Sequence, residues 1–126
     1  MSKEIPAHVI YEDEEFIAIL DLFPNRQGQT LVIPKKHYDS YAFDMPDDDY
    51  CKLLLTAKKV GKLLDRKLGA LRTAMVMEGL GVDHVHIKLY PMKRGIIEGA
   101  LSTALGPKAD DNKLRELAQK IRAPVV

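Results

Sequence analysis

Cysteine and long apolar runs are scarce or missing in this sequence, and each absence excludes a class of protein. Cys51 is the one cysteine, so neither an intrachain disulfide nor a cysteine-based zinc site can form. No apolar run approaches the roughly 20 residues of a membrane span. The start, MSKEIPAHVI, lacks the apolar core of a signal peptide, so the cytoplasm is the expected location.

Charge of either sign is in no excess. The 19 Lys and Arg residues nearly balance the 18 Asp and Glu residues, and the formal net charge is +1. Because the two signs are interspersed, no general attraction to nucleic acid or to a membrane surface is expected. With 126 residues, 46% of them hydrophobic, the chain fits one domain over residues 1–126.

Short β-branched runs predict an antiparallel sheet. Residues 8–12 and 15–22 flank an acidic turn and predict a hairpin, and residues 30–36 predict a third strand. Residues 72–78 and 83–91 predict two more strands, joined by a short turn. The sequence therefore predicts a sheet of about five strands.

Two segments have the periodicity of helices. Between residues 46 and 68, apolar residues recur at steps of three and four, with Asp44 and the following acids as the expected cap and Gly69 at the end. Residues 109–121 predict a C-terminal helix, and residues 92–108 are expected to form a loop with a helical turn. The predicted fold class is α+β, with the long helix lying across the sheet.

The segment DHVHIKLYP, residues 83–91, alternates polar and apolar side chains. Because successive strand residues point to opposite faces, one set can enter the core while the other lines a polar surface. The polar set is His84, His86 and Lys88, and the apolar set is Val85, Ile87 and Leu89. The polar surface has three candidate uses: a solvated sheet face, a metal site, or nucleophilic attack on phosphorus.

A metal site is the least favoured of the three. Asp83 points to the opposite face, and Lys88 would place a positive charge beside the cation. A neutral imidazole is a good nucleophile toward phosphorus, and neighbouring imidazole and ammonium groups can stabilise charge on phosphate oxygens. No metal and no cofactor is therefore expected, while a solvated face and a phosphate site both stay open.

Two stretches resemble the histidine triad (HIT) family of nucleotide hydrolases and transferases. They are IPAHVIYEDEEFIAILDLFPNRQGQTLVIPKKH, residues 5–37, and DHVHIKLYP, and the resemblance covers roughly residues 5–92. It implies an HIT-like fold, a purine nucleotide substrate and a homodimer. It also implies cleavage of a phosphorus bond next to a nucleoside monophosphate through a nucleotidyl-histidine intermediate. Phosphoramidates, adenylates and dinucleoside polyphosphates are the candidate substrates.

The family motif is His-φ-His-φ-His-φ-φ, and its middle histidine attacks the α-phosphate. By resemblance this role falls on His86, and His84, the first histidine, orients it through backbone contacts. Lys88 stands where the family has a third histidine that contacts the scissile bridge. A lysine can bind a phosphate oxygen but is poorly matched to proton transfer at neutral pH.

The resemblance also assigns nucleotide-binding residues. Asp21 matches the acid that holds the ribose hydroxyls, although an acid at a strand end also satisfies turn amides. Ile19 and Leu22 match apolar residues against the base, and Gln29 stands where many members have a histidine near the phosphate. His37 is expected to be a surface histidine.

Several departures from the family pattern predict slow turnover. Besides Lys88 and Gln29, the turn EGLGVD is short, and Met77 occupies a position where a phosphate-side asparagine is common. The segment before EIPA, which in the family forms part of the base pocket, is also expected to be largely missing. Losing a general acid typically costs about 10²- to 10⁴-fold in rate. The chain is therefore expected to act on good leaving groups, or to be a catalytically weak nucleotide-binding or interaction module.

Overall fold

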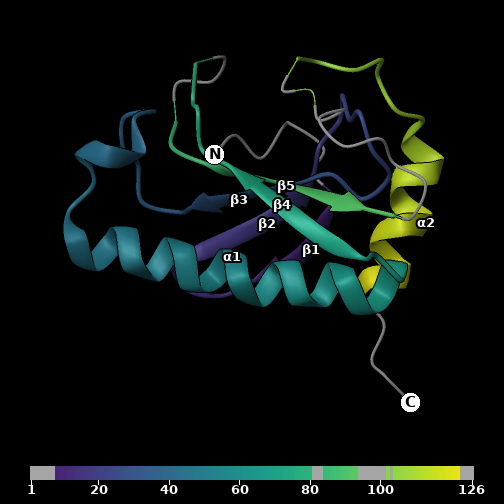
Figure 1. Ribbon diagram of the computed structural model, residues 1–126, viewed down its shortest axis with the longest axis horizontal. Coiled ribbons are helices and arrows are strands. Elements are labelled where there is room, and N and C mark those ends of the chain that lie inside the picture. The colour runs from purple at the N-terminus through teal and green to yellow at the C-terminus, as the bar shows by residue number, and fades with distance from the viewer. Residues whose placement is uncertain (1–7, 81–83, 94–101, 103, 123–126) are drawn as a thin grey trace.

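A five-stranded antiparallel sheet with one long helix on one face forms the centre of the molecule (Figure 1). In the computed structural model we describe residues 8–80, 84–93, 102 and 104–122. The strands are β1 Val9–Glu12, β2 Phe16–Leu20, β3 Thr30–Pro34, β4 Arg72–Val76 and β5 Ile87–Met92. The helices are the 3₁₀ turn η1 Ala42–Asp44, α1 Asp47–Leu68 and α2 Asp111–Arg122. The predicted α+β fold class is confirmed.

The strand order across the sheet is β1-β2-β3-β5-β4, with every neighbouring pair antiparallel. Both predicted hairpins are present, and β3 lies between them. The strand predicted over residues 83–91 begins later than expected, at Ile87. The reason lies in its neighbour: β4 ends at Val76, which is opposite Lys88, so residues 84–86 lie beyond the last paired residue.

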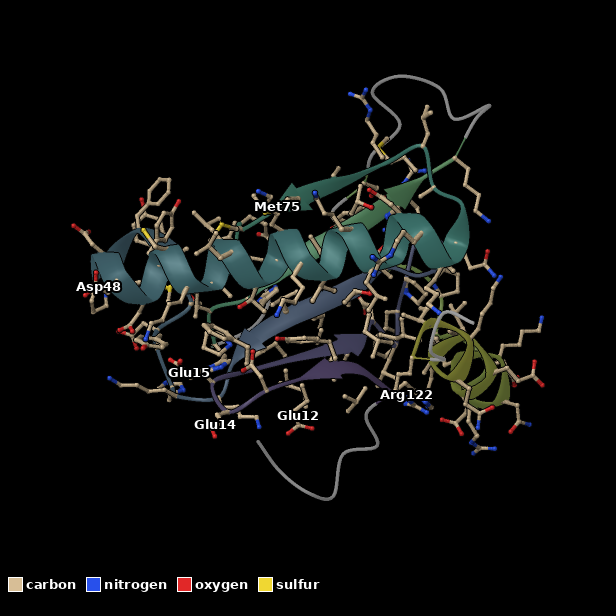
Figure 2. The ribbon with its side chains drawn as sticks, turned by 90° about the horizontal axis from the view of Figure 1, so that it is seen from below. Glu12, Glu14, Glu15, Asp48, Met75 and Arg122 are labelled. Atoms are coloured by element: carbon tan, nitrogen blue, oxygen red, sulfur yellow. The ribbon has the colours of Figure 1, made fainter. Side chains whose placement is uncertain are left out.

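α1 lies across one face of the sheet because its apolar residues form a stripe at helical spacing (Figures 1 and 2). The helix ends at Gly69, which adopts a φ of 65° and donates its N–H to the Asp65 carbonyl. The expected cap by Asp44 is wrong, because Asp44 belongs to η1 and the residue before α1 is Pro46. Three aspartates in the first turn still interact favourably with the helix dipole.

The register gives each face of the sheet its own set of side chains. The face toward α1 forms the core, and its buried sheet residues include Ala18, Leu20, Val32, Ile87 and Leu89, which Val85 joins from just before β5. On the opposite face, one row of mutually paired residues crosses all five strands. In order, this row is Val9, Ile19, Leu31, Lys88 and Val76.

The C-terminal helix packs at one end of the sheet and confirms the predicted pattern. Leu114, Ala118 and Ile121 are its buried residues, and the Asp110 carboxylate accepts the N–H of Lys113 at 3.1 Å, as an N-cap does. At its other end, the Arg122 guanidinium donates to the Val9 carbonyl at 2.6 Å (Figure 2).

Most of the loop predicted over 92–108 lies outside the described residues. Within the described ranges, no helix has the length and apolar character that crossing a membrane requires.

Candidate functional site

The side chain of His86 has a defined orientation and a defined tautomer. Its Nδ1 lies 3.0 Å from the carbonyl oxygen of His84. Because a carbonyl oxygen only accepts hydrogen bonds, Nδ1 carries a proton, and the neutral ring therefore presents a lone pair at Nε2. His86 is only 4% exposed, and its neighbours Val85 and Ile87 are completely buried in the core. The residue is therefore held firmly with one nitrogen ready to act as a nucleophile.

The side chain of His84 contacts both the end of β3 and the loop that follows β3. Its Nε2 lies 3.0 Å from the Pro34 carbonyl oxygen, and its Nδ1 lies 3.2 Å from Nδ1 of His37. The two imidazole rings stack, with centroids 5.1 Å apart and planes 26° apart. His37 is exposed as expected, but its contact with His84 was missed, because 47 residues separate the two in sequence.

Lys88 lies on the face of β5 that points away from α1. It is half-buried between the partnered residues Leu31 and Val76. Among the described residues, no carboxylate forms an ion pair with its ammonium group. A partly buried cation without a counter-ion favours the binding of an anion, because the anion compensates for the lost hydration.

Asp21 and Gln29 form a buried pair that closes the loop after β2. The Asp21 carboxylate accepts the N–H of Phe23 at 2.9 Å and the Gln29 side-chain amide at 2.8 Å. Gln29 in turn accepts the N–H of Asn25 at 2.9 Å. The carboxylate thus satisfies a turn amide, and its remaining lone pairs can accept further hydrogen bonds. Contacts of Asp21 with ribose, and of Gln29 with phosphate, stay predictions.

The two predicted base contacts lie in different environments. Ile19 is half-buried in the same row as Lys88, with Leu31 between them. With neighbouring strands about 4.8 Å apart, Ile19 and Lys88 are separated by about 10 Å on one face. Leu22 packs against the core cluster. Ile19, but not Leu22, therefore belongs to the row of residues that contains Lys88.

Tyr90 is a polar residue of this face that the sequence reasoning missed. It is fully buried, and its hydroxyl has no hydrogen-bond partner among the residues that the structure describes. Burial, and then the negative charges of Asp21 and Glu78, raise the pKa of the phenol, so it stays protonated and can donate. The alternation contained the signal for this residue, because Tyr90 continues the even-numbered series that includes His86 and Lys88.

These groups suit chemistry on a phosphate. An imidazole lone pair can attack phosphorus, an ammonium group can hold a phosphate oxygen, and a phenol can donate a hydrogen bond. In the part of the chain that the structure describes, no three His, Cys, Asp or Glu side chains converge as a metal site requires.

Comparison with known proteins agrees with this geometry. A model of the HIT domain family matches residues 2–95. An uncharacterized HIT-like protein of Methanocaldococcus jannaschii, MJ0866, is 42% identical over 100 residues, which cover 75% of this chain and 76% of that protein. The adenosine 5'-monophosphoramidase HNT1 of Saccharomyces cerevisiae is 30% identical over 129 residues, which cover 98% of this chain and 77% of the yeast protein.

The fold is also shared with solved structures. The crystal structure of a hypothetical histidine triad nucleotide-binding protein of Sulfolobus tokodaii, ST2152, superposes with a TM-score of 0.82. It is 28% identical, and the match covers 95% of this chain and 84% of that one. The sequence match, the shared fold and the arrangement around His86 agree, and the chain belongs to the HIT domain family.

Proposed function

We propose that this protein cleaves a phosphorus bond next to a nucleoside monophosphate through a covalent intermediate on His86. The observation that carries the proposal is the hydrogen bond from His86 Nδ1 to the His84 carbonyl, which leaves Nε2 unprotonated. In the first step Nε2 bonds to phosphorus while the bond to the leaving group breaks. In the second step a water oxygen bonds to phosphorus and loses a proton to the solvent, while the phosphorus–Nε2 bond breaks and its electron pair returns to His86.

Lys88 makes a phosphoramidate or an adenylate the preferred substrate. Its ammonium can neutralise a phosphate oxygen in the transition state, but at neutral pH it does not exchange protons as readily as a histidine. The leaving group must therefore need little help from an acid. The yeast relative, whose name describes an adenosine 5'-monophosphoramidase, supports this substrate class. The proposal is contradicted if a dinucleoside tetraphosphate is cleaved far faster than adenosine 5′-phosphoramidate.

The first test is AMP release from adenosine 5′-phosphoramidate by wild type and by His86→Ala. Loss of a covalent nucleophile should lower the rate by at least about 10⁴-fold. His8→Ala is the matched control, because His8 pairs with Asp111 in the first turn of α2, away from the motif. Equal release by His86→Ala and wild type would show that His86 is not the nucleophile.

A nucleotide-binding or interaction module is the alternative, and two observations favour it. The third motif position is a lysine, and the Gln29 amide is already bonded to Asp21. No AMP release from wild type, with nucleotide binding intact, would support the module. Activity that a chelator abolishes would instead indicate a metal-dependent phosphohydrolase.

A homodimer and a cytoplasmic location stay predictions, and the structure offers a surface that supports the dimer. β4 is an edge strand that lies beside α1 (Figure 2). A groove of about 470 Å³ is lined by residues of α1, β4 and β5. Met75 lies in this groove and is 50% exposed.

A second copy of the chain could cover both the apolar groove and the unpaired edge. Met75→Glu should then give a monomer in light scattering, whereas a monomeric wild type contradicts the dimer.

A further inference from the structure

His37 lies outside the motif, yet its side chain bonds to the first residue of that motif. We propose that His37 is a positioning residue that fixes the tautomer of His84 and, through it, the orientation of His86. The inference rests on the proposed function, because it assigns His37 a part in preparing the same nucleophile. His37 itself has no contact with His86 among the hydrogen bonds of the described residues.

The donors and acceptors follow from the groups that each imidazole meets. His84 Nε2 faces the Pro34 carbonyl oxygen, an acceptor, so Nε2 must carry a proton. In a neutral ring, His84 Nδ1 is then an acceptor, and the proton between the two rings must come from His37 Nδ1. His37 therefore donates a hydrogen bond to His84, and His84 donates one to the Pro34 carbonyl, with one proton in each contact.

This series of hydrogen bonds matters because residues 84–86 lack strand pairing. β5 begins at Ile87, so the carbonyl group of His84 is outside the paired part of the β4–β5 ladder. That carbonyl accepts the Nδ1 proton of His86 and so decides which nitrogen faces the substrate. Val85, which is completely buried, holds the backbone on one side of this carbonyl, and the side chain of His84, held at both nitrogens, holds it on the other.

The loops that carry the two ends of the contact are packed together closely. Gly79, with a φ of 65°, lies against the backbone carbonyl of Ser40, where a Cβ atom would have no room. The segment after β4 is thus pressed against the segment that contains His37. The contact between His37 and His84 therefore lies beside a closely packed junction between these two segments.

Removing the donor should affect the nucleophile more than substrate binding. Without His37 Nδ1–H, the Nδ1 of His84 loses its partner, and the ring can adopt the other tautomer or turn away from Pro34. A lost neutral hydrogen bond corresponds to at most about a tenfold change. We expect kcat to fall by up to about tenfold, while KM changes by less than about twofold.

Three substitutions separate the hydrogen bond from other effects. His37→Phe keeps an aromatic ring for stacking and removes the donor. His37→Asn keeps an N–H group near the position of Nδ1 but cannot titrate. Asp39→Ala is the matched control, because Asp39 is exposed in the same loop. AMP release from adenosine 5′-phosphoramidate is measured with EDTA present, so that no metal ion bridges the imidazoles.

Nitrogen-15 NMR of the imidazole rings gives a readout that does not need activity. In the wild type we expect the proton on Nδ1 of His86 and on Nε2 of His84. In His37→Phe the His84 signals should show a mixture of tautomers, and kcat should fall. His37→Asn should restore the wild-type tautomer of His84 and bring kcat to within about threefold of the wild-type value. Asp39→Ala should match wild type in both readouts.

The two proposals fail in different ways. Wild-type tautomers and wild-type kcat in His37→Phe would overturn the positioning role and leave the proposed function intact. A loss in His37→Asn as large as that in His37→Phe, with unchanged tautomers, would also overturn it, since the donor would not be the cause. If the wild type releases no AMP, the proposed function fails, and the NMR result alone decides whether His37 sets the tautomer of His84.

Discussion

The two sides of β5 and of the residues just before it differ in composition and in how their positions are fixed. Toward α1 lie Val85, Ile87 and Leu89, which are 0%, 0% and 2% exposed. Away from α1, Lys88 is half-buried and the Tyr90 hydroxyl is buried. Among the described residues the lysine has no ion pair and the hydroxyl has no hydrogen-bond partner. The side toward α1 is packed against apolar side chains of the core. The opposite side carries polar groups without partners among the described residues.

This difference shows how the core fixes the polar groups. A slip of one residue in the pairing of β5 would turn Lys88 into the core and Ile87 out of it. The burial of the apolar side chains therefore selects the register that places the ammonium group on the opposite face. The core determines where the polar groups lie, although it makes no contact with a ligand.

The largest effect on stability is expected for Ile87→Ala. Truncating a fully buried isoleucine removes apolar contacts and leaves a cavity, which costs about 2–5 kcal/mol of unfolding free energy. Ile33→Ala on the opposite face, where Ile33 is half-buried, should cost less. Denaturant unfolding of both variants measures the difference, and equal losses would contradict the contrast between the two faces.

The reverse pattern is expected for Lys88→Gln, with activity lost and stability retained. A hydrogen bond to a charged group contributes about 1.5–3 kcal/mol, so AMP release should fall about 10- to 100-fold. The unfolding free energy should change by less than about 1 kcal/mol, because no described carboxylate depends on this cation. Lys120→Gln on α2 is the control, since Lys120 is exposed. Unchanged release by Lys88→Gln would remove Lys88 from the site.

Much of the fold could be predicted because periodicity reports burial directly. The step of two along the segment DHVHIKLYP correctly placed Val85, Ile87 and Leu89 in the core, and the step of three or four identified α1. The start of β5 could not be predicted, because it depends on where its partner β4 ends. The cap of α1 was wrong for a similar reason: Asp44 is a good capping residue, but it lies in η1.

Less of the candidate site could be predicted, because several of its contacts join distant segments. The His84 position came from the resemblance, but its partner His37 lies 47 residues away, and only the folded chain brings the rings together. The hydrogen bond from the Gln29 amide to Asp21 was not predicted either, and the contact of Gln29 with phosphate stays a prediction. Tyr90 was overlooked because a tyrosine in an apolar strand is usually assigned to the core.

Tyr90→Phe should change the unfolding free energy least of these variants, and the sign of the change is informative. A buried hydroxyl without a partner destabilises the fold, so its removal should leave stability unchanged or raise it by about 1 kcal/mol. Because burial raises the pKa of Tyr90 above its ordinary value, the unfolded state loses its proton first as the pH rises. Stability is therefore retained below about pH 10 and declines above it.

The decline of stability above about pH 10 should be weaker in Tyr90→Phe. Unfolding measured from pH 8 upward tests this expectation. Tyr41→Phe is the control, because Tyr41 is 54% exposed. A loss of about 1 kcal/mol or more in Tyr90→Phe would show that the hydroxyl already has a partner within the protein. A stable variant that binds AMP more weakly would show the opposite, namely that the fold carries an unpaired donor whose partner is the nucleotide. The polar face would then differ from the core in a precise sense: its hydrogen bonds are completed by the ligand.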